Sequence, residues 1–271
     1  MGDPDTHFKT VYGPVTSWRY GQSLGIDPIG AVSTCSFNCI YCQLGEIEQL
    51  SGDRRLFIPT DQILQELEPF APWPVDVITL SGSGEPTLAL NLGDILGGIK
   101  RLTGKSTLVL TNATLLTDPQ VRAELAQADK VAVKLDALNP DRLRRINRPI
   151  ATITLDRILQ GIQAFRQDYQ GQLSVQTMVI TPWNEATLQH YVELIRRIAP
   201  QEIQLNTPTR PKPLQRELEG RGNHTSNHYG DRPVAHLKCV EPALLNTLAQ
   251  AIETMTAIPC RCRPLIHPAL A

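Results

Sequence analysis

Long apolar runs are absent from the sequence. No stretch approaches the roughly 20 consecutive apolar residues that a membrane-spanning helix needs. The first seven residues, Met1 to His7, are polar and acidic, and they contain neither the basic nor the apolar segment of a signal peptide. We therefore expect a cytoplasmic protein that has no membrane as a partner.

An excess of charge of either sign is also absent. Lys and Arg together number 26, against 27 Asp and Glu, so no overall basic field attracts nucleic acid. A local basic patch is not excluded, so tRNA remains a possible partner that the composition does not favour. Repeats and low-complexity tracts are missing as well. The length of 271 residues suits one large α/β domain.

Cysteine is scarce, and none precedes Cys35. In a reducing compartment we expect the six cysteines to be metal ligands or free thiols. Three of them, Cys35, Cys39 and Cys42, fall within eight residues. Iron–sulfur cubes usually have four cysteine ligands, so three would leave one iron open to a further ligand. A zinc site usually needs four ligands in paired Cys-x2–4-Cys units, but zinc or three buried thiols remain the alternatives.

The triplet, with the aromatic Tyr41 before its last cysteine, resembles the radical S-adenosylmethionine (SAM) superfamily. The resemblance covers roughly residues 11–210 and is greatest to a branch related to the wyosine-base (tRNA imidazoguanosine) synthetases, most of which have no assigned reaction. The matching segments are Tyr12–Val15, Ser23–Pro28, Cys39–Gly45, Gly82–Leu88, Leu135–Ala137 and Ile146–Pro149.

The resemblance implies that Cys35, Cys39 and Cys42 hold a [4Fe–4S] cluster whose open iron binds the amino and carboxylate groups of SAM. Tyr41 would add a stacking surface beside that iron. Reductive cleavage of SAM would release methionine and a 5′-deoxyadenosyl radical, which abstracts hydrogen from an unknown substrate. The implied reductant is a flavodoxin or a ferredoxin.

Apolar runs alternate with helical patterns along the chain. Six buried strands are predicted, at Ile29–Thr34, Val77–Ser81, Thr107–Thr111, Val131–Leu135, Leu173–Ile180 and Glu202–Asn206. Helices are predicted at residues 61–68, Leu92–Leu102, Asp118–Gln127, Leu155–Asp168, Glu185–Ile198 and Glu241–Thr256. This alternation predicts an α/β fold with a parallel sheet. The resemblance makes it a partial (β/α)6 TIM-like barrel over residues 1–209, with a C-terminal loop and helix extension over residues 210–271.

The candidate site residues follow the predicted strands. Sites in barrels of this kind form at the C-terminal ends of the strands. The cysteine loop, the segment Gly82–Thr87, Asn112 and Asp136 come after the first four predicted strands in turn. We therefore expect these elements to meet on one face of the barrel.

The segment Gly82, Ser83, Gly84 and Glu85 resembles the superfamily's Gly-Gly-Glu element, with Ser83 in place of one glycine. Small residues allow the backbone to approach a ligand closely. The resemblance implies that its carbonyls and Glu85 accept hydrogen bonds from the SAM ammonium group, while a tight turn with a surface charge is the alternative. Asn112 would bond the ribose or methionine part of SAM, or would simply form a turn.

Lys134 and Asp136 lie on one face of a predicted strand, since strand side chains alternate. Lys134 would bind the SAM carboxylate and Asp136 a ribose hydroxyl. Lys134 is also a candidate catalytic nucleophile or proton donor towards substrate, because buried lysines shift their pKa readily. The alternative is a structural ion pair.

Several further polar residues could meet the substrate. Arg210 and Lys212, just beyond the sixth strand, are placed to meet an anionic substrate. The residues expected to point into the pocket are Gln176, Met178, Gln204 and Asn206. A basic run that could contact tRNA phosphates, or form an ordinary solvated helix face, consists of Arg142, Arg144, Arg145 and Arg148.

The remaining cysteines, Cys239, Cys260 and Cys262, are candidates for a second iron–sulfur cluster in the extension. His236 or His267 could supply a fourth ligand, and His224 and His228 could instead bind zinc. Free thiols are the simpler interpretation, because Cys-x20-Cys-x-Cys matches no known ligand spacing.

Two alternative functions remain at this stage. The wyosine-type synthetases that this branch resembles have second-cluster cysteines and a pyruvate-binding lysine upstream of the triplet. Here Lys9 is the only upstream lysine and no cysteine precedes Cys35. These differences count against pyruvate-dependent tRNA ring formation, and a wyosine-type tRNA-modifying enzyme is kept only as an alternative. A non-catalytic iron–sulfur or electron-transfer protein is the other.

Overall fold

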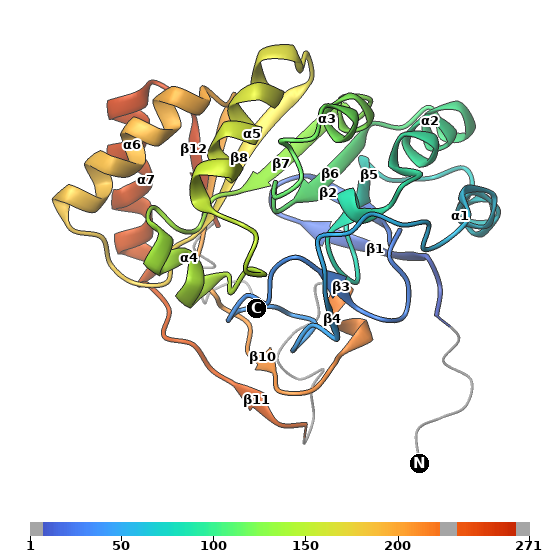
Figure 1. Cartoon of the computed structure of the whole chain (residues 1–271), viewed down its shortest axis with the longest axis horizontal. Coiled ribbons are helices and arrows are strands. Elements are labelled where there is room, and N and C mark those ends of the chain that lie inside the picture. The colour runs from blue at the N-terminus through green and yellow to red at the C-terminus, as the bar shows by residue number, and fades with distance from the viewer. Residues whose placement is uncertain (1–7, 223–231, 264–271) are drawn as a thin grey trace.

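The computed structural model describes residues 8–222 and 232–263. Its centre is a curled parallel sheet, half of a barrel (Figure 1). The parallel strands are β2 (Gly21–Ile26), β5 (Val77–Leu80), β6 (Thr107–Thr111), β7 (Lys130–Lys134), β8 (Gln172–Met178), β9 (Glu202–Asn206) and β12 (Cys260–Cys262), neighbours in that order. A further strand, β1 (Val11–Ser17), pairs antiparallel with β2 at one edge.

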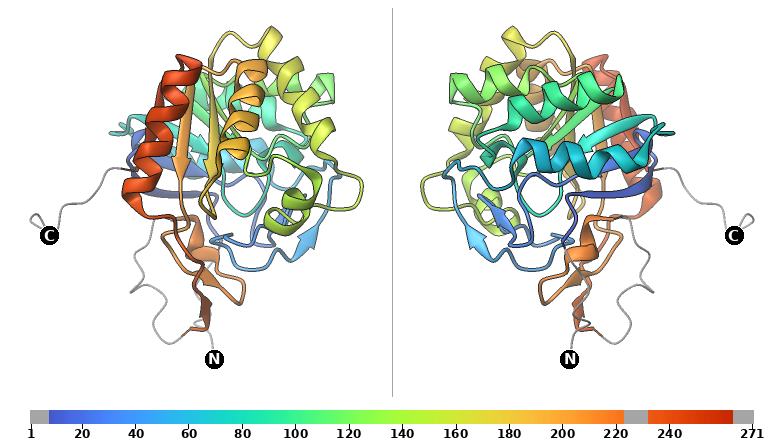
Figure 2. Two further views of the ribbon diagram at one scale, coloured as in Figure 1. Left: turned by 90° about the vertical axis from the view of Figure 1, so that its left-hand side faces the viewer. Right: turned by 90° about the vertical axis from the view of Figure 1, so that its right-hand side faces the viewer.

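Helices follow the parallel strands, and most of them cover the outer face of the sheet (Figures 1 and 2). They are α1 (Thr60–Leu67), α2 (Leu92–Thr103), α3 (Pro119–Leu125), α4 (Pro140–Ile146), α5 (Leu155–Asp168), α6 (Glu185–Ile198) and α7 (Pro242–Thr256). Asn139, Thr154 and Asn184 begin α4, α5 and α6 with side-chain caps on the first turn. No helix in the described residues is both long and apolar enough to cross a membrane.

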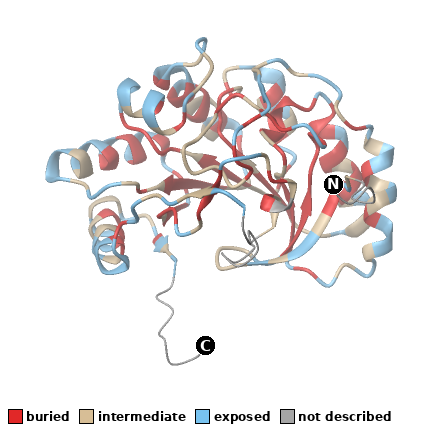
Figure 3. Cartoon of the chain, turned by 90° about the horizontal axis from the view of Figure 1, so that it is seen from below, coloured by how far each residue is buried: buried red, intermediate tan, exposed pale blue. Residues whose placement is uncertain are grey.

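The two faces of the sheet have different chemistry. Leu173 and Val175 of β8 and Ile203 of β9 belong to the core between sheet and helices. The alternation of strand side chains therefore turns Gln176 and Gln204 to the concave face, where their amides bond each other at 2.9 Å. Figure 3 shows the same separation, with buried residues along the strands and exposed ones on the outer helix faces. The barrel interior is thus polar enough to bind a polar ligand.

The predicted partial barrel is confirmed, and the five predicted strands from Val77 to Asn206 match β5 to β9 within two residues at each end. The first predicted strand is wrong. Residues 29–33 form a loop, and the barrel strand before it is β2. The Asp27 carboxylate accepts the backbone N–H groups of Ile29 and Gly30 at 3.0 and 3.2 Å. This turn ends the strand before the apolar run begins.

The C-terminal extension adds the last strand to the half-barrel. Its helix α7 leads into β12, which pairs parallel with β9, so one extension strand belongs to the main sheet. Two short strand pairs lie at the opposite end of the molecule from the helices: β3 (Thr34–Cys35) with β4 (Gln49–Leu50), and β10 (Lys212–Pro213) with β11 (Val234–Ala235) (Figures 1 and 2). The division of the chain at residue 209 stays a prediction.

Candidate active site at the C-terminal ends of the strands

The cysteine loop is attached to the Gly82–Glu85 turn by backbone hydrogen bonds. The N–H of Thr34 donates to the carbonyl of Ser83 at 3.0 Å, and the N–H of Glu85 donates to the carbonyl of Thr34 at 3.1 Å. The approach is so close that a Cβ on Gly84 would lie 1.7 Å from the Thr34 oxygen. Only glycine fits there, so the Gly82–Glu85 sequence fixes the start of the cysteine loop.

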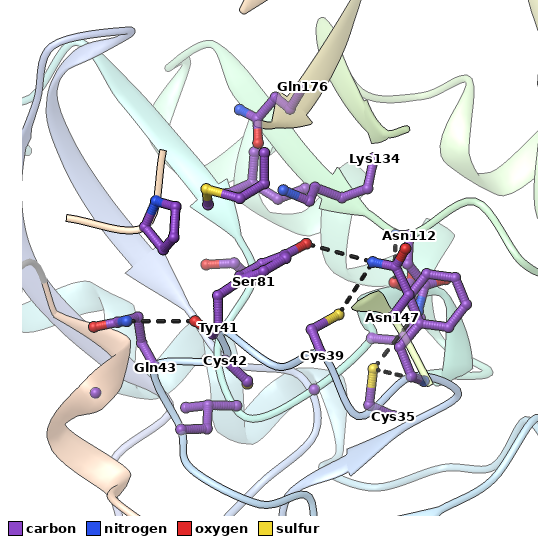
Figure 4. Close-up of a pocket in the computed structure, with 18 of the residues that line it drawn as sticks. Cys35, Cys39, Tyr41, Cys42, Gln43, Ser81, Asn112, Lys134, Asn147 and Gln176 are labelled. Atoms are coloured by element: carbon purple, nitrogen blue, oxygen red, sulfur yellow. Dashed lines mark hydrogen bonds between the residues drawn. The ribbon is translucent and has the colours of Figure 1, made fainter. Parts of the chain in front are cut away.

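Cys35, Cys39 and Cys42 line one cavity of about 340 Å³ at the C-terminal ends of the strands (Figure 4). All three are free thiols. Of the residues predicted from the sequence to contact SAM, those that line the same cavity are Tyr41, Gly82, Gly84, Glu85, Asn112 and Lys134. Ser83 and Asp136 are not part of its wall. The size is in the range of small-molecule sites.

The donor set fits an iron–sulfur cube. Within the described ranges no three His, Cys, Asp or Glu side chains converge on a single ion, whereas each thiolate of a cube binds a different iron. Desolvation raises the pKa of Cys39 to about 12 and also raises the pKa values of Cys35 and Cys42. The thiols are therefore protonated without metal, and bound iron would deprotonate them.

Two side-chain amides point at these sulfurs. Nδ2 of Asn112 lies 3.6 Å from Sγ of Cys35, and Nδ2 of Asn147 lies 3.4 Å from Sγ of Cys39 (Figure 4). The backbone N–H of Phe37 donates to Sγ of Cys35 at 3.4 Å. N–H donors of this kind stabilise negative charge on thiolate ligands, which is what a cluster site requires.

Glu85 is buried, and protein groups already bond its carboxylate. Oε1 accepts the N–H and hydroxyl of Thr87 at 3.1 and 2.7 Å and the hydroxyl of Thr111 at 2.5 Å. Oε2 accepts the N–H of Asn112 at 2.7 Å. Desolvation raises the pKa of Glu85, and these bonds oppose it. The carboxylate therefore joins the ends of β5 and β6, and its predicted contact with the SAM ammonium group stays a prediction.

Asn112 is likewise bonded within the protein. Its Nδ2 donates to Oγ of Ser36 at 2.8 Å, and its Oδ1 accepts the N–H and hydroxyl of Thr114 at 3.1 and 2.8 Å. The side chain thus ties the loop after β6 to the cysteine loop. Its predicted contact with SAM stays a prediction, and the hydrogen bonds favour a role in holding Cys35.

Asp136 has a fully buried side chain with four partners. Oδ1 accepts the N–H of Met178 at 2.7 Å and lies 3.4 Å from Nζ of Lys134. Oδ2 accepts Nδ2 of Asn147 at 2.8 Å and the hydroxyl of Tyr41. Asp136 therefore binds the end of β7 to the cysteine loop, while its proposed ribose contact remains a prediction.

Lys134 brings a positive charge to the wall of the cavity. Nζ lies 5.1 Å from the centre of the Tyr41 ring and points into the pocket in Figure 4. The side chain is 24% exposed, so the ammonium group can bind an anionic part of a ligand without leaving its ion pair with Asp136. Its predicted roles, in binding SAM or in catalysis, stay predictions.

The segment after β9 covers the cavity. The sequence did not indicate which of its residues reach the cavity wall. Asn206 to Arg210 line the wall, as do Gly220 and Arg221. The N–H of Glu217 donates to the carbonyl of Leu44 at 3.0 Å, next to the cysteine triplet. Lys212 is buried and pairs with Glu46, so it faces the cysteine loop instead of a substrate. Arg210 lines the cavity, and its contact with an anionic substrate stays a prediction.

Sequence reasoning did not assign Asn147 to the site. The segment Ile146–Pro149 was noted only for its resemblance, beside the arginine run. The position directly after α4 places the Asn147 amide within bonding distance of both Asp136 and Cys39. The sequence signal that could have identified Asn147 is its place directly after the helix that follows β7. Contact of the neighbouring arginines with tRNA stays a prediction.

The extension cysteines face elsewhere. Cys260 and Cys262 of β12 pack towards α7, where Sγ of Cys262 lies 2.6 Å from Oδ1 of Asn246. Cys239 is exposed, and its thiol donates to the carbonyl of Pro208 at 2.8 Å. The candidate ligands His224, His228 and His267 lie outside the described residues. A second cluster stays a prediction.

Comparisons with known proteins agree with this geometry. The sequence profile of the Radical SAM superfamily matches residues 31–195. The UPF0026 protein slr1464 of Synechocystis is 69% identical over 261 residues, which cover 96% of this chain and 98% of that protein. A UPF0026 protein of Helicobacter pylori is 34% identical over 207 residues, 74% of this chain and 67% of the relative.

Solved structures share the fold. Streptococcus suis SuiB bound to S-adenosylmethionine superposes with a TM-score of 0.57 at 13% identity, covering 88% of this chain and 46% of that one. A radical SAM methyltransferase from Sphaerobacter thermophilus gives 0.58 at 14% identity, covering 89% and 66%. The chain thus spans about half to two thirds of the length of these two proteins.

Proposed function

The chain belongs to the radical SAM superfamily, and from this premise we propose that it reductively cleaves SAM to a 5′-deoxyadenosyl radical, which abstracts hydrogen from a substrate. One observation carries the proposal: three free thiols share a single cavity with the Gly82–Glu85 turn and Lys134. A [4Fe–4S] cluster bound to the thiols would supply the electron that breaks the sulfonium C–S bond.

The chain's own residues divide into ligands, contacts and supports. Cys35, Cys39 and Cys42 hold three irons. Lys134 presents a positive charge to the SAM carboxylate, because it faces the cavity and keeps Asp136 as a partner. The backbone of the Gly82–Glu85 turn offers carbonyl acceptors to the ammonium group.

The supports position these groups and do not need to touch the ligand. Hydrogen bonds that join the strand ends and the cysteine loop already occupy the side chains of Glu85, Asn112 and Asp136. The reductant in this proposal is a flavodoxin or ferredoxin. It reaches the cluster from the side of the cysteine loop, because the sheet and its helices close the other side (Figure 2).

The test is formation of 5′-deoxyadenosine. Protein reconstituted anaerobically with iron and sulfide is mixed with SAM and dithionite, and the products are separated by chromatography. We expect 5′-deoxyadenosine and methionine in equal amounts, dependent on the reductant. The Cys39→Ala variant should form none, while Cys239→Ala, which alters an exposed thiol outside the cavity, should behave as the wild type. Fully loaded wild-type protein that forms no product would refute the proposal.

A further inference from the structure

A second, smaller cavity of about 120 Å³ lies inside the half-barrel, next to the cysteine cavity. The two cavities share four wall residues, namely Ser81, Leu110, Gln176 and Arg221. Arg19 and Tyr20, from the turn between β1 and β2, line its far side. Two arginines and no carboxylate appear among the described residues of this wall.

The turn that carries Arg19 crosses the open side of the half-barrel. The hydroxyl of Tyr20 donates to Oε1 of Gln204 on β9 at 3.2 Å. Nη2 of Arg261 on β12 donates to the carbonyl of Arg19 at 3.3 Å. These contacts join the first hairpin to the last two strands of the sheet, and they fix the position of the Arg19 backbone.

In the described part of the chain, no carboxylate pairs with the Arg19 side chain. Its Nε is buried and has no hydrogen-bond partner, and none of the ion pairs in the described residues includes it. Its guanidinium lies 4.3 Å from the centre of the Trp18 ring. A buried N–H group without a hydrogen-bond partner is costly, so this Nε is suited to bind an acceptor on a ligand.

Three more arginines surround this group. The pKa of Arg19 is lowered to about 10. Desolvation is the largest cause, and the positive charges of Arg210, Arg263 and Arg261 also lower it. Arg261 pairs with Glu202. Arg263 donates to the hydroxyl of Thr209 at 2.8 Å, which is a neutral partner. Arg19 is thus close to three other arginines, and it is the one whose Nε is buried without a partner in the described part of the chain.

We propose that Arg19, in the wall of the second cavity, forms a subsite for an anionic group, a phosphate or carboxylate, of the substrate, with Arg210 in the wall of the adjoining cavity. The subsite deepens the proposed function and rests on it. Guanidinium groups bind such anions through paired hydrogen bonds. Because the two cavities share a wall, a substrate anchored at Arg19 extends past Gln176 towards SAM, where its hydrogen is abstracted.

The subsite corrects one sequence-based expectation and extends another. Arg210 and Lys212 were both expected to meet an anionic substrate. Lys212 is already paired with Glu46 beside the cysteine loop. Arg19 takes its place, although it lies near the N-terminus and only the hairpin brings it to the site.

Calorimetric titration of the cluster-loaded protein with inorganic phosphate, and separately with citrate, tests the subsite. We expect one of the two anions to bind in a salt-sensitive way, and the anion that binds identifies the substrate's acidic group. Arg19→Met keeps the apolar stem and removes the charge, and should weaken binding at least tenfold. Arg197→Met, which alters an exposed arginine of α6 on the outer layer, should bind as the wild type does.

Thermal unfolding of the same variants without added anion separates binding from folding. Because Arg19→Met removes a buried Nε that has no hydrogen-bond partner, the Tm of this variant should be equal to or above that of the wild type. Unchanged anion affinity in Arg19→Met, or no binding of either anion to the wild type, would overturn the subsite. Wild-type protein that cleaves SAM yet binds neither anion loses only the subsite. Protein that binds an anion but forms no 5′-deoxyadenosine loses only the proposed function.

Discussion

Individual side chains at this site mainly hold other side chains in place. Asn147 donates to Asp136 and reaches the Cys39 sulfur, and Asp136 also accepts the hydroxyl of Tyr41. One buried amide thus connects the helix after β7, the strand itself and the cysteine loop. Such contacts set the orientation and the electronic properties of a metal ligand.

Replacing Asn147 with alanine should lower the reduction potential of the cluster. The amide N–H near Cys39 stabilises the more negative, reduced cluster, so its loss disfavours reduction by about 1 kcal/mol, the typical value of one hydrogen bond. A potentiometric titration monitored by electron paramagnetic resonance (EPR) measures this. Asn139→Ala removes an exposed helix cap and should change stability but not potential. Equal potentials for Asn147→Ala and wild type would contradict the role of Asn147.

Alanine at Gly84 and at Gly97 should have opposite effects. A Cβ at Gly84 overlaps the Thr34 carbonyl, so Gly84→Ala should lower the free energy of unfolding by about 1–3 kcal/mol. Gly97 is inside α2, where the nearest atom to a new Cβ is the flexible Arg101 guanidinium at 3.1 Å. Gly97→Ala should therefore stabilise the protein by about 0.5–1 kcal/mol. Urea denaturation of both variants decides the signs.

Residue-level sequence reasoning identified the ligands and not their supports. The spacing of Cys35, Cys39 and Cys42 is local, so the chain alone reveals it. The roles of Asn147 and Arg19 depend on contacts across 108 residues to Cys39 and 242 residues to Arg261. No local pattern encodes such distances.

Secondary-structure elements were predictable where their apolar runs were continuous. β5 has four consecutive buried residues, and the strands up to β9 followed the same pattern. β2 was not predicted because Gly21 and Gly25 interrupt its apolar pattern. Gly25 is required there, because a Cβ would lie 2.2 Å from the Tyr12 ring. β12 has only three residues and exists because β9 offers a free edge.

One element covers the site from the C-terminal side. The 3-10 helix η3 (Leu218–Arg221) carries Arg221, whose guanidinium lies 4.9 Å from the ring centres of both Phe8 and Tyr12. Arg221 pairs with Asp27 at 3.0 Å, with side chains 5% and 0% exposed. The pair fastens this helix to the end of β2.

Removing only the positive charge of the Asp27–Arg221 pair should lower the free energy of unfolding more than removing both charges. Arg221→Met leaves the Asp27 carboxylate buried without its counter-charge, and should cost about 3–5 kcal/mol of unfolding free energy. Adding Asp27→Asn should recover part of the loss. Urea denaturation under identical conditions compares the three proteins. A double variant less stable than Arg221→Met would show that the ion pair does not fasten the helix.

At the scale of the whole molecule, the open side of the half-barrel and the C-terminal ends of its strands differ in function. The β1–β2 hairpin and β12 meet across the open side, and the arginine cluster gathers there. The cysteine loop and the covering segment close the C-terminal ends of the strands. The resemblance predicted the half-barrel, whereas the contact across its open side depends on packing between the β1–β2 hairpin and β12.

The metal content of the whole chain distinguishes one cluster from two. Because Cys260 and Cys262 face α7 and Cys239 is exposed, we expect about four irons and four sulfides per chain after reconstitution. Replacing all three of these cysteines with serine should leave the iron content unchanged. A value near eight that falls to four in this triple variant would instead establish a second cluster in the extension.

The most direct test of the central claim is the EPR spectrum of the reduced, reconstituted protein with and without SAM. In a cluster held by Cys35, Cys39 and Cys42, the fourth iron has no cysteine ligand and would bind the amino and carboxylate groups of SAM. The g values of the reduced cluster should therefore shift in a saturable way on addition of SAM. A spectrum that SAM leaves unchanged, in protein with full iron content, would contradict the radical SAM function.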